Sequence, residues 1–256
     1  MSRNWDLFDL TGKRACITGA SSGIGQALAS GLAVAGASVV GVARRSDALE
    51  TWQEKSRDRG LKVDILAADL GSPASAADVA QQVGALFGMP DILINAAGVN
   101  ARRPADEITV DEWRRVLDLN LSTPFFLAQA FVPAMQAKAW GRIINIASLQ
   151  SQRAFTNGIS YGASKGGVTQ LTRAMAEAWS RDGILCNAIA PGFFPTPLTG
   201  PVYEDPAAVA RLAAQTCVGR NGELADLVGP AVFFASEASR YVTGQVLYVD
   251  GGFTAK

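Results

Sequence analysis

Histidine is absent from the 256 residues of this sequence. A Ser-His-Asp triad, a Cys-His pair and a histidine-ligated metal site each require an imidazole, so the sequence excludes all three. Proton transfer must therefore depend on Tyr, Lys, Cys, Asp or Glu side chains. An excess of either charge is also missing, because Lys plus Arg and Asp plus Glu both count 23. We therefore expect neither a nucleic-acid partner nor binding to an anionic membrane.

Cysteine and long apolar runs are scarce as well. The three cysteines, Cys16, Cys186 and Cys217, lie far apart without C-x-x-C spacing, which indicates neither a disulfide framework nor a zinc site. No stretch approaches the ~20 apolar residues that cross a bilayer, and the first residues, MSRNWDLFDLTGK, contain no signal-peptide core. We expect a cytoplasmic protein with reduced thiols, no membrane segment and no bound metal.

The chain does contain a repeated alternation of short apolar runs with helix-like segments, which is typical of βα units around a parallel sheet. We expect strands at residues 14–18, 38–43, 62–68, 91–97, 142–148, 184–190 and 245–250. We expect helices at 23–35, 46–59, 73–87, 109–118, 124–138, 161–181 and 225–236. Without a dividing linker, residues 1–256 are predicted to form one doubly wound Rossmann-type α/β domain with a seven-stranded parallel sheet flanked by helices.

Residues 191–215 break this alternation. Five prolines, at positions 191, 195, 197, 201 and 206, interrupt helical and strand periodicity in this segment. Ligands of α/β sheets bind beyond the carboxyl ends of the strands, so an excursion after the sixth strand is well placed to form a lid over the site. A surface loop without a gating role is the open alternative.

The segment TGASSGIG, residues 18–25, fits two incompatible interpretations, and both require a strand before it and a helix after it. As G-x-S-x-G around Ser21, it resembles the turn that presents a nucleophilic serine in hydrolases. As Gly19, Gly23 and Gly25, it lets the backbone approach a dinucleotide pyrophosphate at a helix N-terminus. The absence of an imidazole to activate Ser21 favours the second interpretation.

Arg44 and Arg45 stand at the end of the expected second strand, where an NAD-selective site carries Asp or Glu. A guanidinium at this place attracts a 2′-phosphate, so NADP(H) is favoured, with NAD(H) open as an alternative. The competing interpretation is that both arginines only solvate the start of a helix.

Tyr161 and Lys165, in YGASK, are four residues apart and share one helix face. A free tyrosine has a pKa of about 10, and lowering this pKa to about 7 takes roughly 4 kcal/mol of preferential stabilisation of the phenolate. A neighbouring ammonium and a positively charged oxidised nicotinamide supply such stabilisation, so we expect a lowered Tyr161 pKa. Taken alone, this spacing is more often an amphipathic surface pair.

In combination, these elements resemble the short-chain dehydrogenase/reductase family over nearly the whole chain. The matching elements, in order, are TGASSGIG at 18–25, Asp69, NAAG at 95–98, Asn120, Ser148, Tyr161 with Lys165, and Pro191-Gly192. The resemblance implies an NAD(P)-dependent oxidoreductase that acts on CH–OH groups. It also implies a homo-oligomer, usually a tetramer, with the helices at 124–138 and 161–181 in one interface.

The resemblance implies four catalytic residues. Tyr161 exchanges a proton with the reacting oxygen, Lys165 lowers the Tyr161 pKa and binds the nicotinamide ribose, and Ser148 hydrogen-bonds the reacting oxygen. Asn120 holds a water that links Lys165 to solvent. Further cofactor contacts are implied at Gly19, Ser21, Ser22, Gly23, Ile24, Gly25, Arg44, Arg45, Asp69, Leu70, Asn95, Ala96, Ala97, Gly98, Pro191, Gly192, Phe194 and Thr196.

Within the family, the stretches LFDLTGKRACITG and ASRYVTGQVLYVDGG resemble gluconate 5-dehydrogenase-type sugar-acid enzymes. Such enzymes tend to carry Glu after S-x-x-S and a basic residue three positions further, where this chain has Gln152 and Phe155. Arg102 and Arg103 follow the NAAG loop, Arg153 follows Ser148, and these arginines are candidates for a substrate carboxylate. The open alternative is that they only form a solvated rim. Substrate contacts are implied at Ser148, Gln150, Arg153, Tyr161 and Phe193.

The sequence thus predicts hydride transfer between NADP(H) and a hydroxy or keto group of a small sugar acid such as gluconate or 5-ketogluconate. A 3-oxoacyl-[acyl-carrier-protein] reductase shares the fold, cofactor and catalytic residues and is one alternative. A non-catalytic cofactor-binding regulatory protein is another, although the intact set of Asn120, Ser148, Tyr161 and Lys165 argues against it.

Overall fold

The computed structural model describes residues 4–256. Within these residues, seven parallel strands form one sheet in the order β3-β2-β1-β4-β5-β6-β7. The strands are β1 (Arg14–Thr18), β2 (Ser38–Ala43), β3 (Val63–Ala67), β4 (Ile92–Asn95), β5 (Gly141–Ile146), β6 (Ile184–Pro191) and β7 (Val246–Val249). The strand order reverses between β1 and β4, which is where doubly wound sheets bind their ligands.

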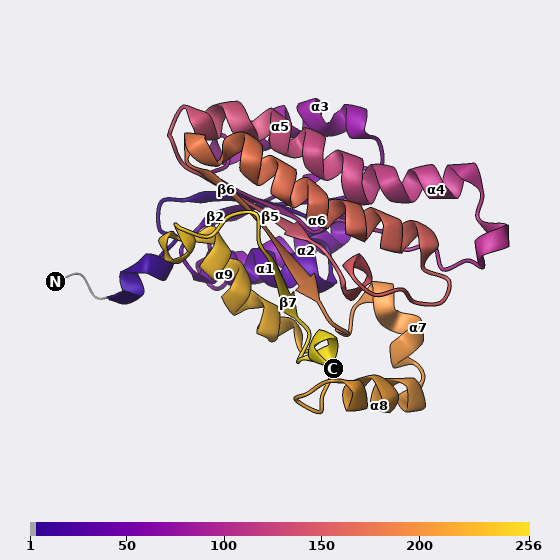
Figure 1. Ribbon diagram of the computed structural model, residues 1–256. Helices are drawn as coiled ribbons and strands as arrows, with labels where there is room; N and C mark the ends of the chain where they lie inside the picture. Colours follow the sequence, from indigo (N-terminus) through magenta and orange to yellow (C-terminus); the bar gives the residue numbers. More distant parts are fainter. Residues whose placement is uncertain (1–3) are drawn as a thin grey trace.

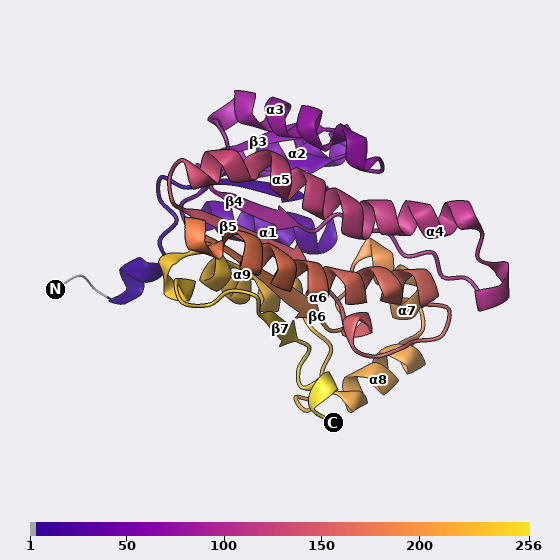
Figure 2. The ribbon, with the colours of Figure 1, turned by 45° about the horizontal axis from the view of Figure 1, so that its top comes forward.

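Helices cover both faces of this sheet (Figures 1 and 2). One face carries α1 (Gly23–Val34), α2 (Ser46–Arg57) and α9 (Val228–Ala235), and the other carries α3 (Ala76–Phe87), α5 (Thr123–Gln136) and α6 (Ile159–Trp179). Helix α4 (Val110–Leu117) continues into α5 through a π-helical stretch, Asp118–Ser122, and packs beside α6. The doubly wound arrangement predicted from the sequence is confirmed.

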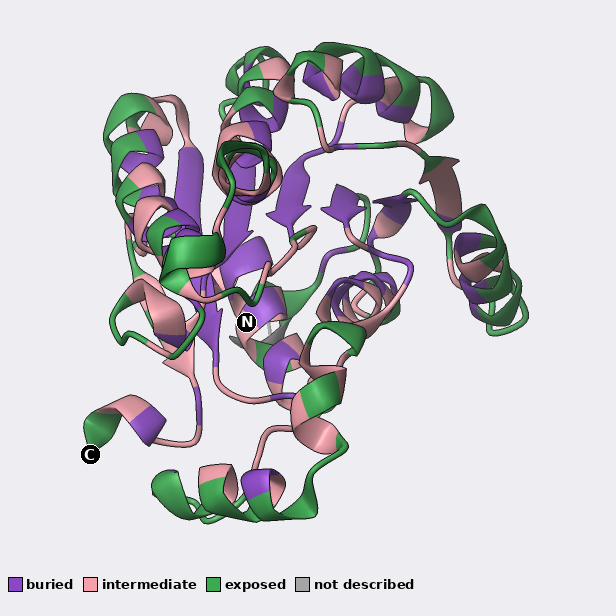
Figure 3. Ribbon diagram, turned by 90° about the vertical axis from the view of Figure 1, so that its right-hand side faces the viewer, coloured by how far each residue is buried: buried purple, intermediate pink, exposed green. Residues whose placement is uncertain are grey.

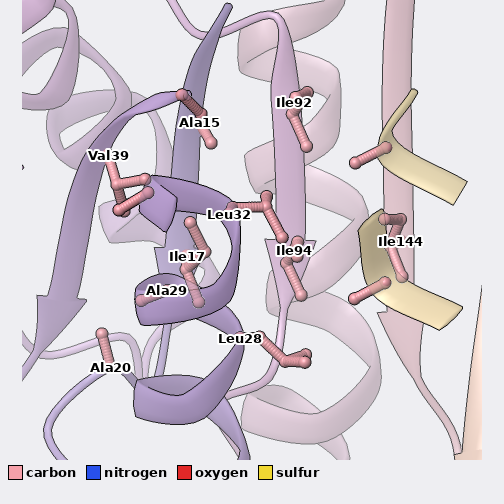
Figure 4. Close-up of a cluster of buried hydrophobic side chains, with 14 of the residues drawn as sticks. Ala15, Ile17, Ala20, Leu28, Ala29, Leu32, Val39, Ile92, Ile94 and Ile144 are labelled. Atoms are coloured by element: carbon pink, nitrogen blue, oxygen red, sulfur yellow. The ribbon is translucent and has the colours of Figure 1, made fainter. Parts of the chain in front are cut away.

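The core lies on the two faces of the strands. Figure 3 shows the strands largely buried and the helices exposed on their outer sides, as expected for a parallel sheet covered twice. Between α1 and the sheet, Leu28 and Leu32 pack with Ile17 and Ile94 (Figure 4), and all four side chains are fully buried. This packing fixes the start of α1 against the end of β1, where the glycine-rich turn lies.

The segment after β6 differs from the expectation of an irregular excursion. It contains two helices, α7 (Gly200–Tyr203) and α8 (Pro206–Gln215), which lie next to the C-terminus in Figures 1 and 2. Asp205 caps α8 by accepting a hydrogen bond from the Ala207 amide at 2.9 Å, and Pro206 occupies the first turn, where its missing N–H costs nothing. The prolines thus start helices in this segment instead of preventing them.

The other differences concern element ends. Helix α6 begins at Ile159, two residues before Tyr161, so this tyrosine lies in the first turn. The expected helix at 225–236 is divided into a 3₁₀ turn, Leu224–Leu227, and α9. Among residues 4–256, none of the helices is both long and apolar enough for a membrane span.

Candidate active site

A cavity of about 1010 Å³ lies at the carboxyl ends of the strands. It crosses the ends of β2, β1, β4, β5 and β6, which spans four strand spacings, about 19 Å. The residues predicted from the sequence that line it are Gly19, Ser21, Ser22, Gly23, Ile24, Gly25, Arg44, Arg45, Asp69, Leu70, Ala96, Ala97, Gly98, Ser148, Gln150, Tyr161, Lys165, Pro191, Gly192, Phe193, Phe194 and Thr196. The sheet topology therefore gathers residues from six separate parts of the chain.

The glycine-rich turn fits a bound dinucleotide. Gly19 has φ +72°, and a Cβ there would lie 2.9 Å from the Ala97 amide nitrogen. A Cβ on Gly25 would collide with the carbonyl oxygen of Gly19, so glycine permits the close packing of α1 on the turn. Ser22 precedes α1 without capping it by its side chain, which leaves the first amides of the helix for an anionic group.

Two arginines lie beside this turn. Arg45 donates to the Ser21 hydroxyl at 3.0 Å and to the Ser22 hydroxyl at 2.6 Å. Arg44 also lines the cavity and is exposed. Both arginines thus stand at the end of β2, with the Arg45 guanidinium held by the two serines, where they suit a phosphate on an adenosine ribose.

The loop after β4 is tied to β1 by a residue that the sequence reasoning did not select. The Thr18 hydroxyl accepts hydrogen bonds from the amides of Ala96 and Ala97, both at 3.0 Å. Thr18 is the first residue of the TGASSGIG segment, and its side chain is buried at the end of β1. A hydroxyl residue at the end of an expected strand was the feature of the sequence that could have indicated this role. Its contribution is to place the 95–98 loop along the cavity.

Asn95 and Asn120 do not line the cavity. The side-chain NH₂ group of Asn95 donates to the side-chain carbonyl oxygen of Asn145 at 2.9 Å, between β4 and β5. The Asn120 carbonyl oxygen accepts from the Val99 amide at 2.9 Å, and its NH₂ group donates to the Val99 carbonyl at 2.9 Å and to the Ser164 hydroxyl at 3.1 Å. Both side chains therefore brace the walls, and the relay water expected at Asn120 stays a prediction.

Lys165 and Tyr161 meet at the end of β5. The Lys165 ammonium donates to the Ile146 carbonyl at 2.6 Å and lies 5.6 Å from the centre of the Tyr161 ring. Burial lowers the pKa of Lys165 to about 8. The Lys165 ammonium is thus buried, held against a strand-end carbonyl, and has a pKa well below the usual value for lysine.

The pKa of Tyr161 departs from the expectation of a lowered value. Burial of its hydroxyl raises this pKa, and the opposing effects are a hydrogen bond with Ser148 and the positive charge of Arg102. The expectation depended on the Lys165 ammonium together with a positively charged oxidised nicotinamide, and the raised pKa is that of the protein's own groups. The hydroxyl is therefore protonated at neutral pH, which suits donation of a proton to a carbonyl oxygen.

The far end of the cavity is closed by aromatic residues and the segment after β6. Phe193 and Phe155 line the wall, with ring centres 5.9 Å apart. Arg153, expected at the substrate, instead lies over the Phe253 ring at 5.2 Å and donates to the Phe253 carbonyl at 3.4 Å. The structure thus does not bring Arg153 to the cavity, because an aromatic ring from the C-terminus binds it.

Several lining residues were not assigned from the sequence to the cofactor or the substrate. They are Val99, Asn100, Leu119, Ile146, Ala147, Leu149, Thr156, Asn157, Gly158, Pro197, Leu198, Thr199, Val202, Ala208, Arg211 and Leu212, with Ala43 and Ala68 at the other end. Most belong to loops and to α7 and α8, whose positions depend on long-range packing. Arg102 also lines the cavity, whereas Arg103 is paired with Glu112 at 3.1 Å.

The cavity is basic although the chain has no net charge. Among the described residues that line it, the cationic ones are Arg44, Arg45, Arg102, Lys165 and Arg211, and the acidic one is Asp69. Asp69 accepts from the Gly71 amide at 2.9 Å. Such an excess of positive charge in one cleft favours anionic ligands.

The fold and this site define a nicotinamide-dependent oxidoreductase of the Rossmann type, and the comparisons agree. The family model described as enoyl-(acyl carrier protein) reductase matches residues 19–254. The chain belongs to this family of short-chain dehydrogenases and reductases, as the sequence motifs predicted.

Particular relatives have narrower descriptions. Gluconate 5-dehydrogenase of Gluconobacter oxydans (strain 621H) is 41% identical over 249 residues, covering 97% of each chain. The 2-dehydro-3-deoxy-D-gluconate 5-dehydrogenase of Bacillus subtilis (strain 168) is 39% identical over 256 residues, covering 98% of each. A crystal structure of a gluconate 5-dehydrogenase from Burkholderia cenocepacia J2315, in complex with NADP and tartrate, has a TM-score of 0.94 and 40% identity, covering 99% of this chain and 100% of the other.

Proposed function

We propose that this protein transfers a hydride between NADP(H) and a hydroxy or keto group of a small sugar acid such as gluconate or 5-ketogluconate. The observation that carries the proposal is one continuous cavity with Tyr161 and Ser148 beneath it and guanidiniums at both ends. The named relatives act on gluconate derivatives, and one solved relative holds NADP with a dicarboxylate, tartrate.

The cofactor side follows from the turn and the two arginines. The uncapped start of α1 would hold the pyrophosphate, and Arg44 and Arg45 would hold the 2′-phosphate of the adenosine ribose. Asp69 and Leu70, which line the cavity, would contact the adenine, and Pro191, Gly192 and Thr196 would contact the nicotinamide end. Bound NADPH supplies the hydride.

The proton chemistry falls to the chain's own residues. Tyr161 would donate its hydroxyl proton to the carbonyl oxygen during reduction and accept the alcohol proton during oxidation. Ser148 would hydrogen-bond the same oxygen and stabilise the charge that develops on it. Lys165 would bind the nicotinamide ribose and return a proton towards Tyr161, with Asn120 holding the relay water beside it.

The substrate side combines Gln150 and Phe193 with Arg102. Arg102 is exposed in the cavity, donates to the Leu198 carbonyl at 3.3 Å and lowers the pKa of Tyr161 by its charge. A carboxylate of the substrate would meet this guanidinium. We further propose that the segment 191–215 acts as a lid, since its residues form one wall of the cavity.

The substrate proposal is tested with purified protein, NADPH and a panel of ketones, by following the loss of absorbance of the reduced cofactor. We expect turnover of 5-keto-D-gluconate or 2-dehydro-3-deoxygluconate to exceed that of an acetoacetyl thioester. Higher activity with the thioester would establish a 3-oxoacyl-[acyl-carrier-protein] reductase instead. NADPH binding without turnover of any ketone would favour a regulatory protein.

The cofactor proposal is tested with Arg45→Gln. The loss of a charge-assisted contact with the 2′-phosphate should raise the KM for NADPH roughly tenfold or more and leave the KM for NADH nearly unchanged. Arg59→Gln, an exposed arginine after α2, is the matched control. An unchanged ratio of the two cofactors in Arg45→Gln would remove Arg45 from this role.

The proposed assembly is a homotetramer in the cytoplasm. Support for an interface on α5 comes from Phe126, which is 42% exposed and follows Phe125, whose ring stacks on Trp179 of α6 with ring centres 6.4 Å apart. Multi-angle light scattering should give four times the 26.8 kDa chain mass. A monomer mass would overturn this part of the proposal.

A further inference from the structure

One face of α8 forms part of the cavity wall. Ala208, Arg211 and Leu212, spaced i, i+3 and i+4, all line the cavity, so this helix face is directed at the site. Ala208 is buried, and the Val209 carbonyl accepts a hydrogen bond from Asn221 at 3.0 Å, which anchors the helix. The turn of α8 that precedes Arg211 is therefore anchored to the rest of the protein.

The guanidinium of Arg211 lacks a protein partner among the residues described. Arg220 and Arg103, by contrast, are engaged: Arg220 pairs with Asp226 at 2.7 Å, and Arg103 pairs with Glu112 at 3.1 Å. No hydrogen bond, ion pair or ring contact of the Arg211 side chain is present in the described part of the chain. A cavity-lining cation without a carboxylate is a group that a ligand anion can satisfy.

The position of Arg211 separates it from the cofactor phosphates. Asn221 donates to the Val209 carbonyl of α8, and the next residue, Gly222, donates its amide to the Phe193 carbonyl at 2.9 Å, so α8 is tied to the aromatic end of the cavity. Arg44 and Arg45 instead follow β2. Tyr161 and Ser148 follow β5, the neighbour of β6. Arg211 thus belongs to the substrate half of the cavity.

Among the described residues, the aromatic part of the cavity lining lacks a cation of its own. Phe155, Phe193 and Phe253 form an aromatic cluster with ring centres 5.8 to 6.3 Å apart. Arg153, the nearest guanidinium in sequence, lies over Phe253 and outside the cavity lining. The cations that remain for a substrate carboxylate are Arg102, which contacts the lid at Leu198, and Arg211, which is part of the lid.

We infer that Arg211 is a specificity-determining residue that binds the substrate carboxylate together with Arg102. This inference rests on the proposed function. The two guanidiniums come from different elements, the loop after β4 and helix α8, so a carboxylate between them links the lid to the loop. A ketone without a carboxylate forms neither contact, and this makes the lid a selector for acids.

The test compares Arg211→Gln and Arg211→Lys with wild type on 5-keto-D-gluconate and on neutral 5-keto-D-fructose. Arg211→Gln should lower kcat/KM for the acid by roughly 10- to 100-fold, mainly through KM, because a charge-assisted contact is lost. The neutral ketone and NADPH should change by less than about twofold. Arg211→Lys should recover part of the loss, and the exposed Arg240→Gln should behave as wild type.

A second readout does not depend on turnover. Calorimetric titration of D-gluconate into the NADPH-saturated protein, in which both ligands are already reduced and cannot react, should show weaker binding to Arg211→Gln by a similar factor. Equal losses for acid and neutral ketone, or no loss for either, would overturn the inference while the proposed function stands. A wild-type protein that neither reduces keto acids nor binds D-gluconate would overturn the proposed function, and the inference with it.

Discussion

The two halves of the cavity differ in how their polar groups are satisfied. In the cofactor half, Thr18, Asn95 and Asn120 hydrogen-bond other parts of the protein and brace the walls. In the substrate half, the side-chain carbonyl oxygens of Asn100 and Gln150 are buried without a partner among the residues described. A buried unpaired carbonyl costs stability, so its retention in a ligand cavity points to a ligand hydroxyl or water as its partner.

In the cofactor half, which we call the braced half, polar side chains hold the walls of the site. In the substrate half, which we call the recognition half, polar side chains are left to contact a ligand. Substitution in the first group should reduce stability, and substitution in the second should reduce affinity for the substrate. Tyr161 stands where the halves meet, and Lys165 belongs to the braced half, because its ammonium is bonded to the Ile146 carbonyl.

Tyr161→Phe should give the largest effect. Removal of the proton donor should lower kcat by roughly 10²- to 10⁴-fold, because general acid–base catalysis contributes that much. NADPH binding, measured by fluorescence titration, should stay within about twofold, because the phosphate contacts lie in the other half. Tyr241→Phe is the matched control, since this ring is 100% exposed. A Tyr161→Phe protein with wild-type kcat would refute the assigned role.

The braced half can be probed through pH. The pKa of Lys165 is lowered from 10.5 to about 8, so between these values the unfolded chain binds more protons than the folded protein. This lysine therefore makes the unfolding free energy rise with pH across that window. Lys165→Met should remove a rise of roughly 2 kcal/mol between pH values of about 8 and 10.

Urea unfolding of the protein alone at both pH values measures this contribution as a difference between wild type and variant. Burial raises the pKa of Cys16 and of Cys186 to about 12, which opposes the trend equally in both proteins and cancels. Lys62→Met, at an exposed position, is the control. The same pH slope in wild type and Lys165→Met would show that the ammonium is not desolvated.

The braced half was largely predictable from the sequence. Gly19, Gly23 and Gly25 precede a helix after an apolar strand, and turn chemistry of this kind is local. Tyr161 and Lys165 share a helix face by spacing alone. The parallel sheet then brings these separate motifs to one edge, so fold and catalytic group followed from pattern and family resemblance together.

The recognition half was not predictable in the same way. Arg153 is drawn away by Phe253, 100 residues along the chain. Arg211 reaches the cavity only because Asp205 and Pro206 start a helix within a proline-rich segment. Burial likewise decides the pKa of Tyr161, and burial depends on the whole fold.

The smallest expected effects come from a pair of substitutions, one in each half. Thr18→Val should lower the unfolding free energy by roughly 1–3 kcal/mol, because it leaves the amides of Ala96 and Ala97 without their acceptor. Thr18→Ser, which keeps the hydroxyl, should recover most of this loss. Gln150→Met keeps the side-chain bulk and removes an unpaired carbonyl, so the unfolding free energy should change by less than about 0.5 kcal/mol.

Urea unfolding and the KM for 5-keto-D-gluconate, measured on the same three variants, decide between the two roles. Gln150→Met should raise this KM several-fold while Thr18→Ser leaves it unchanged. If Gln150→Met instead destabilised the protein as much as Thr18→Val, the Gln150 amide would belong to the braced half. The Gln150 carbonyl would then have a structural role, and recognition of the substrate would be left to Asn100 and the segment 191–215.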